Sequence, residues 1–271
     1  MWTSRQTTIL VLGLAYGIVE EGLMVKSFFD PNWMDLGLLG VYGRWAGVNW
    51  VWSLELTLFH AVFSIAIPIL LVELLFPDRR DESWVSRRGM FGLNILLWGD
   101  VVFGYLALTP YRPPFVPYIL AILAVIGLCL LAKRMPASWA KPNGLHNASK
   151  PWKPGFLGFI ATVIFFIIAW VLPNVDVPVA VTMGAMLLLA AVVLGLLRLM
   201  SGDGAWGDTH KLALVSGALM FFILLGPLQQ LDTQRVDNTS GMALVGLVAI
   251  VCLFLLSRKV ARRPLVSTSV L

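Results

Sequence analysis

The chain has 271 residues, of which 58% are hydrophobic and 13% are charged, and its mean hydropathy is +0.83. Soluble domains are about half apolar and about a quarter charged, so this composition excludes an ordinary soluble domain. The net charge of +5 does not indicate nucleic-acid binding, because the basic residues lie in short segments between long apolar runs. The predicted partner is therefore the lipid bilayer and not a nucleic acid.

Eight apolar segments are long enough to cross a bilayer core, which takes about 20 helical residues. They cover residues 7–29, 51–76, 89–109, 116–132, 156–172, 179–199, 212–231 and 242–256. Prolines between 110 and 117 and between 173 and 178 mark two of the connections, since proline suits helix ends and turns. We predict an all-α polytopic membrane protein, one integral membrane domain over residues 1–271 with eight transmembrane helices.

The basic residues between the spans give this topology a direction. With the N-terminus inside, sixteen of the 20 Lys and Arg residues fall in the inner segments, and only Lys26, Arg44, Arg112 and Arg235 fall outside. Positive charge is enriched on the cytoplasmic side of membrane proteins. We therefore expect both termini in the cytoplasm of a protein in the cell (plasma) membrane.

Ionisable residues inside the membrane are concentrated in the first three spans. At a helical rise of about 1.5 Å per residue, Glu20 and Glu21 lie about 20 Å from the inner edge of the first span. His60 enters the second span from outside and reaches about 14 Å, and Asp100 rises from inside to nearly the same level. Buried charges are costly and mark ion or substrate paths. We predict that Glu20, Glu21, His60 and Asp100 form a proton relay or a catalytic set.

Helical spacing assigns faces to these residues. On the second span a polar stripe recurs at intervals of three or four residues, through Ser53, Thr57, His60 and Ser64. On the first span Gly13 and Gly17 permit another helix to approach closely. Tyr16 lies beneath Glu20, Asn94 lies below Asp100, and Glu55 points away from the stripe. The predicted substrate-binding residues are Tyr16, Arg44, Glu55, Thr57 and Asn94.

Each of these residues also fits a structural role. Glu20 or Glu21 can be protonated and bonded to a neighbouring helix, His60 can be a packing residue, and Asp100 can cap a break near Gly99. Lys26 is expected to extend its side chain to the outer interface. The shared depth of four ionisable residues favours a functional site. If a metal binds there, its predicted ligands are Glu21, His60 and Asp100.

The first outer connection, residues 30–50, is the longest on its side and is rich in aromatic residues. Trp and Tyr commonly form a belt at the membrane interface, and this is one interpretation. The other is a lid over the polar layer, in which Arg44 binds an anionic headgroup or a carboxylate. The sequence leaves both open.

The Glu20-Glu21 pair, followed by Lys26 and then by His60 at a distance of 39 residues from Glu21, partly resembles the CAAX-type intramembrane glutamate proteases. That family has an Arg at a different spacing after the pair and a second helical His, and this chain has neither. The similarity covers under a quarter of the chain. It implies a glutamate-dependent hydrolase without establishing membership of the family.

Three functions are compatible with this pattern. The first is proton- or cation-coupled transport of a small solute, since protonatable side chains within the membrane form proton relays. The second is an intramembrane enzyme, a glutamate- or metal-dependent hydrolase acting on a lipid or a peptide. The third is a non-catalytic membrane subunit. The sequence leaves the cofactor and the oligomeric state open, and a small solute or a lipid is the expected ligand.

Overall fold

The structure, a computed structural model, describes residues 4–135, 149–201, 206–232 and 238–263. This part contains eight helices that are long and apolar enough to cross a membrane, which confirms the predicted fold class. Each span lies within a few residues of its expected position. The largest differences are at the ends of the first and last spans, five residues each. The first span ends at Met24 because the chain turns at Lys26, whose φ is +67°, and the last continues to Ala261.

The first three spans each contain a π-helical segment. Span one consists of α1 (Ser4–Gly17) and the π-helix η1 (Ile18–Met24). Span two consists of α2 (Trp50–Phe59), the π-helix η3 (His60–Ala66) and α3 (Ile67–Leu75), and span three of α4 (Arg87–Phe103) and the π-helix η5 (Gly104–Leu108). π-Helical turns are rare and occur frequently at functional sites. Their positions therefore direct attention to residues 18–24 and 60–66.

The remaining five spans are regular α-helices. They are α5 (Phe115–Arg134), α6 (Trp152–Trp170), α7 (Val179–Met200), α8 (Asp208–Leu231) and α9 (Met242–Ala261). Three short 3₁₀ turns, η2 (Gly37–Gly40), η4 (Pro77–Arg79) and η7 (Leu172–Val175), lie in the connections. The strands β1 (Arg44–Trp45) and β2 (Val48–Asn49) form an antiparallel hairpin, with Arg44 opposite Asn49.

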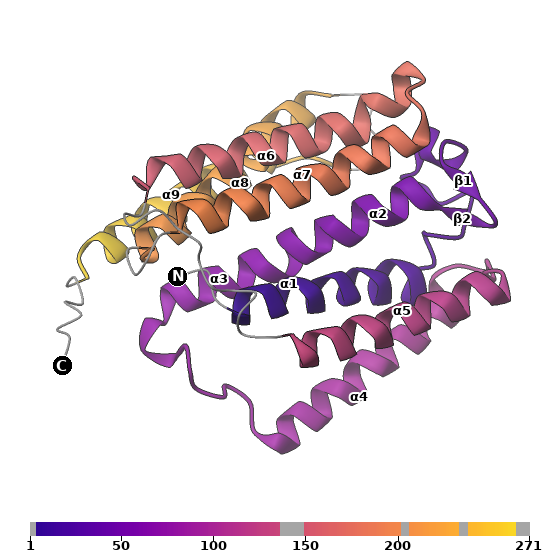
Figure 1. Cartoon of the computed structure of the whole chain (residues 1–271), viewed down its shortest axis with the longest axis horizontal. Helices are drawn as coiled ribbons and strands as arrows, with labels where there is room; N and C mark the ends of the chain where they lie inside the picture. The colour runs from indigo at the N-terminus through magenta and orange to yellow at the C-terminus, as the bar shows by residue number, and fades with distance from the viewer. Residues whose placement is uncertain (1–3, 136–148, 202–205, 233–237, 264–271) are drawn as a thin grey trace.

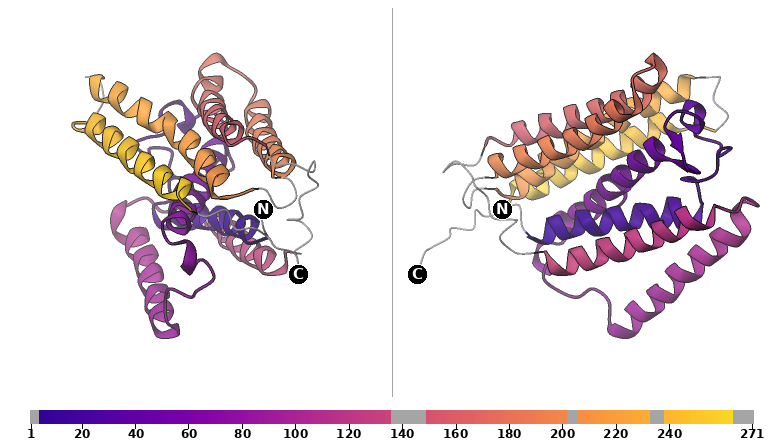
Figure 2. Two further views of the ribbon diagram at one scale, coloured as in Figure 1. Left: turned by 90° about the vertical axis from the view of Figure 1, so that its left-hand side faces the viewer. Right: turned by 45° about the vertical axis from the view of Figure 1, so that its right-hand side comes forward.

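The helices form two groups that lie side by side (Figures 1 and 2). The first helix group consists of spans one to four, from α1 to α5, and the second consists of α6 to α9. Within the first group, spans one and two lie between α6–α9 and the pair α4 and α5 (Figure 1). Helix α4 is at the periphery, and its first turns stand away from the bundle in both figures. Its residues 91–100 are exposed, so in a membrane they face lipid or the space beside α4.

The two ends of the bundle differ in chemistry. At one end the Asp208 carboxylate pairs with Arg80, at 2.6 Å, and with Arg263, and Arg5 pairs with Glu73 at 2.9 Å. We call this the basic end; it holds the start of α1 and the end of α9. We call the opposite end, which carries β1 and β2, the hairpin end. The sequence predicts that the basic end is cytoplasmic.

Candidate functional site

The candidate site lies where the π-helical segments of spans one and two meet. Glu20 and Glu21 belong to η1, and His60 is the first residue of η3. The α1 backbone packs closely against span two, since a Cβ added to Gly13 would lie 2.7 Å from the Ala61 Cα and one added to Gly17 would lie 3.0 Å from the Thr57 Cα. The close helix approach predicted from Gly13 and Gly17 is confirmed. Thr57 contributes to this contact through its backbone.

His60 contacts both glutamates, one with each ring nitrogen. Its Nδ1 lies 3.1 Å from Glu20 Oε2, and its Nε2 lies 3.2 Å from Glu21 Oε1. The Ser64 hydroxyl lies 2.9 Å from the same Nδ1. An imidazolium ring has a proton for each carboxylate, whereas a neutral ring donates to one partner and accepts from another. The arrangement can therefore hold His60 in either protonation state.

Glu21 is fixed from the side opposite His60. The Ser27 hydroxyl donates a hydrogen bond to Glu21 Oε2 at 2.5 Å, and the Trp52 indole N–H donates to Ser27 Oγ at 3.0 Å. A carboxylate with both oxygens engaged has few other orientations. Ser27 and Trp52 were missed in the sequence, because Ser27 lies beyond the end of the helix and shares no helical face with Glu21.

Glu20 is the more accessible of the two carboxylates. Its side chain is 29% exposed, against 15% for Glu21 and 10% for His60. The Tyr16 ring contacts the His60 ring edge-on at 6.0 Å between centroids. Glu21 is thus positioned to orient His60, whereas Glu20 is the carboxylate more exposed to an incoming molecule.

The first outer connection covers the hairpin end of the site. Asn49 is fully buried, and its amide donates to the backbone oxygens of Ser27 and Asp30 at 3.3 and 3.2 Å. The Tyr42 hydroxyl donates to the Val177 carbonyl oxygen at 2.7 Å and so ties the connection to the segment before α7. We call residues 30–50 the roof of the site. The roof fixes the turn that carries Ser27, and Ser27 in turn fixes Glu21.

Arg44 belongs to the roof itself. Its guanidinium donates to Asn49 Oδ1 at 2.7 Å and to the Phe29 carbonyl oxygen at 2.8 Å. Among the described residues it forms no ion pair with Glu20 or Glu21. The geometry therefore gives Arg44 a role in holding the hairpin closed.

Lys26 is fully buried, in contrast to the expectation that it extends to the interface. Its ammonium donates to the backbone oxygens of Tyr105, Thr109 and Tyr111, at 2.7, 3.0 and 3.3 Å. These carbonyls lie at the end of span three and would otherwise lack intrahelical partners. Burial lowers the pKa of Lys26, and the neighbouring Arg112 lowers it further, while Asp30 opposes this shift. Lys26 therefore connects spans one and three.

Three predicted site residues lie outside the Glu20–Glu21–His60 cluster. Asp100 is exposed on α4, forms no hydrogen bond or ion pair within the described residues, and acts on Tyr16 only through its charge. Asn94 is also exposed and donates to the Met90 carbonyl oxygen of its own helix. Glu55 is 3% exposed and forms no ion pair with His60 among the described residues. Asp100 stays apart from the cluster because α4 lies at the periphery.

Within the described residues, no three His, Cys, Asp or Glu side chains are arranged to hold a metal ion. The predicted ligand set of Glu21, His60 and Asp100 is not brought together, because Asp100 stays outside the cluster.

An apolar cavity of about 270 Å³ lies beside the site, between the two helix groups. Phe59 lines this cavity, and its ring also contacts the His60 ring edge-on at 5.4 Å between centroids. The opposite wall includes Phe165, Met186 and Val215, from α6, α7 and α8. Only the Phe59 ring therefore separates the His60 imidazole from an apolar cavity that suits a hydrocarbon chain.

Comparisons with protein-family models, with curated proteins and with solved structures found no match to this chain. The function is therefore argued from the geometry of the site.

Proposed function

We propose that this protein is an intramembrane hydrolase in which Glu20, Glu21 and His60 activate water against an ester bond of a lipid. The observation that carries the proposal is the placement of one imidazole within 3.2 Å of two carboxylates, one of which is fixed by Ser27 and one of which is accessible. A carboxylate beside an oriented histidine is a common arrangement for general acid–base catalysis.

Each residue has a distinct role in the proposed reaction. Glu20 takes a proton from water as the water oxygen bonds to the acyl carbon. The carbon–oxygen bond to the leaving group breaks, and the leaving oxygen takes a proton from the His60 imidazolium. The proton on Glu20 then returns to His60 across their 3.1 Å contact. The products are a carboxylic acid and an alcohol, and Glu21 keeps the imidazole oriented throughout.

The surroundings of the site support a lipid as the substrate. The site lies in the part of the bundle that crosses the membrane, and the neighbouring cavity is lined by apolar side chains. Apolar pockets with a few convergent polar groups are typical ligand sites. A hydrocarbon chain in the cavity would place the adjoining ester close to Glu20.

The polar cluster has no continuation toward the basic end. Span one is apolar from Ile9 to Ala15, and span two is apolar from Ile65 to Val72. A carrier must open its site to both sides of the membrane, whereas a hydrolase needs access from one. This favours the hydrolase over the transporter.

Proton-coupled transport is the second candidate, and the π-helical segments of the first three spans favour it. Conversion of a π-helical turn to α-helix removes one residue from the register and rotates the following residues by about 100°. Such a change in η1 or η3 would separate Glu20 and Glu21 from His60. If proton binding drives this rotation, it would also change the side of the membrane from which a solute can reach the site.

Isotope labelling separates the two functions. The purified protein is reconstituted into liposomes of total lipid extract in water enriched in ¹⁸O, and the lipids are analysed by mass spectrometry. A hydrolase incorporates ¹⁸O into the released acid. We expect Glu20→Gln and His60→Ala to lower this incorporation by at least about 100-fold, the usual size of a general acid–base contribution.

Glu55→Gln is the matched control, because it neutralises a buried carboxyl group on span two that faces away from the site. It should retain labelled product at nearly the wild-type level. Equal incorporation by wild type and Glu20→Gln, or none by the wild type, would contradict the hydrolase. Uptake of a small solute that is driven by a proton gradient would then support the carrier. This uptake would be measured in wild-type liposomes in ordinary water and should be lost in His60→Ala.

A further inference from the structure

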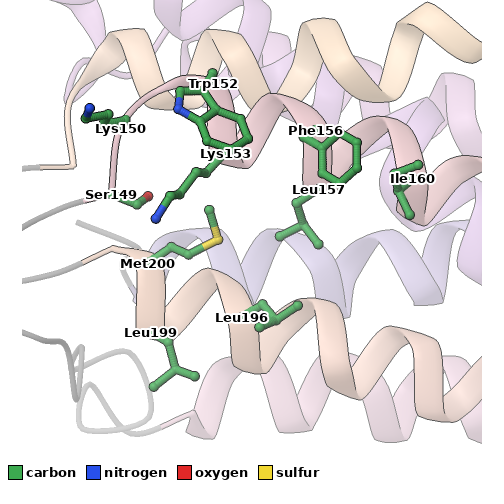
Figure 3. Close-up of a pocket in the computed structure, with 10 residues that line it drawn as sticks. All are labelled: Ser149, Lys150, Trp152, Lys153, Phe156, Leu157, Ile160, Leu196, Leu199 and Met200. Carbon is green, nitrogen blue, oxygen red and sulfur yellow. The ribbon is translucent and has the colours of Figure 1, made fainter.

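A groove of about 760 Å³ lies at the basic end, between the first turns of α6 and the last turns of α7. Figure 3 shows that its two ends differ in character. Ser149, Lys150 and Lys153 lie at one end, whereas Phe156, Ile160 and Leu196 line it toward the middle of the membrane. The groove is thus basic at the membrane surface and apolar below it.

The two lysines are available to bind a ligand. Both are exposed, and neither forms an ion pair with any carboxylate among the described residues. The Ser149 hydroxyl beside them has no hydrogen-bond partner within the same residues. Two free ammonium groups and a hydroxyl make up a donor set that suits the phosphate of a lipid headgroup.

The apolar wall of the groove is exposed, as are many apolar side chains on the outer faces of the spans. Phe156 is 61% exposed, Leu199 is 53% exposed and Leu196 is 38% exposed. In a bilayer these side chains lie at the depth of the acyl chains, and Trp152, which is 64% exposed, lies near the headgroups. A phospholipid matches this order of surfaces, from charged head to hydrocarbon tail.

We propose that this groove binds an anionic phospholipid of the leaflet at the basic end, with its phosphate on Lys150 and Lys153 and one acyl chain along Phe156 and Leu196. Charge complementarity selects an anionic lipid over a zwitterionic one, since basic pockets between transmembrane helices bind such headgroups. The site is far from Glu20 and His60 along the bundle, so the proposal does not depend on the hydrolase.

Native mass spectrometry of the full-length protein tests the proposal, with palmitoyl-oleoyl phosphatidylglycerol and the matching phosphatidylcholine added in equal amounts. The wild type should retain phosphatidylglycerol preferentially. Each lysine near the membrane surface contributes about fivefold to the binding of an anionic lipid. The Lys150→Gln/Lys153→Gln variant should therefore lower the retention of phosphatidylglycerol by about 30-fold.

Arg87→Gln/Arg88→Gln is the matched control, because it removes the same charge from exposed residues at the start of α4, outside the groove. It should lower retention by less than about twofold if the site is local. A second variant, Leu196→Trp, fills the apolar part and should lower retention without changing the charge. Equal losses in the two charge variants, or equal retention of both lipids by the wild type, would overturn the proposal.

Discussion

Glycines permit close helix packing at two interfaces of this protein, between spans one and two and between α6 and α8, but the side chains around them differ. Between spans one and two, Gly17 brings the backbone of α1 against Thr57 and the Cβ of His60, and the contact aligns a polar cluster. Between α6 and α8, Gly158 and Gly217 bring two backbones together with apolar side chains around them. Small residues permit close helix packing in membranes, where no hydrophobic force drives helices together. The first interface aligns the polar cluster, and the second packs two apolar helices against each other.

The comparison explains why the polar cluster lies in the first helix group. Aligning His60 with two carboxylates requires a backbone that can be widened locally, and η1 and η3 provide this. Helices α6 and α8 contain no π-helical segment, although α8 has Pro227 in its last turns, and they contain no Asp or Glu between Phe156 and Trp170 or between Leu212 and Leu231. The apolar helices α6 to α9 therefore pack against the helix group that contains η1 and η3.

The largest expected effect is on stability and comes from Gly217→Ala in α8. The added Cβ would overlap the Gly155 carbonyl oxygen, which belongs to the backbone and cannot turn aside. Overpacking of this kind costs about 3 kcal/mol or more in the free energy of unfolding. Thermal unfolding of the detergent-solubilised protein measures the loss. Gly195→Ala on α7 is the control, since its Cβ would meet no atom within 4 Å, and similar stability in both variants would refute the tight interface.

A smaller loss is expected from Lys26→Met, which breaks the connection between spans one and three. The buried ammonium donates to three carbonyls at the end of span three, and methionine keeps the volume but not the hydrogen bonds. We expect the free energy of unfolding to fall by about 2 kcal/mol, the typical contribution of hydrogen bonds to a charged group. Hydrogen exchange should rise first at residues 104–111.

Arg112→Met is the control for Lys26→Met. The exposed Arg112 guanidinium donates to the same three carbonyl oxygens, at 3.2, 3.3 and 3.1 Å. Exposed interactions contribute less than buried ones, so its loss should cost under about 1 kcal/mol. A larger effect from Arg112→Met would mean that Lys26 contributes little.

The sequence was sufficient for the fold and for the centre of the site. Apolar length gave the eight spans, and helical depth brought Glu20, Glu21 and His60 together, since both depend only on a regular rise along each helix. Depth says nothing about lateral position, which is why Asp100 was expected in a cluster that it does not join. Ser27 and the buried Lys26 depend on the turn after Met24, and no periodic pattern encodes that turn. The π-helical segments likewise leave no mark in hydropathy.

Gly17→Ala is expected to lower stability less than Lys26→Met, and it is the sharpest test of the comparison. Its Cβ would lie 3.0 Å from the Thr57 Cα and 3.2 Å from the His60 Cβ, so spans one and two must separate by a few tenths of an ångström. We expect a loss of about 1 kcal/mol in the free energy of unfolding. The ¹⁸O incorporation should fall about tenfold, because catalysis is sensitive to displacements well below 1 Å. An unchanged rate in a correctly folded Gly17→Ala protein would show that this glycine contact serves packing alone, as it does between α6 and α8.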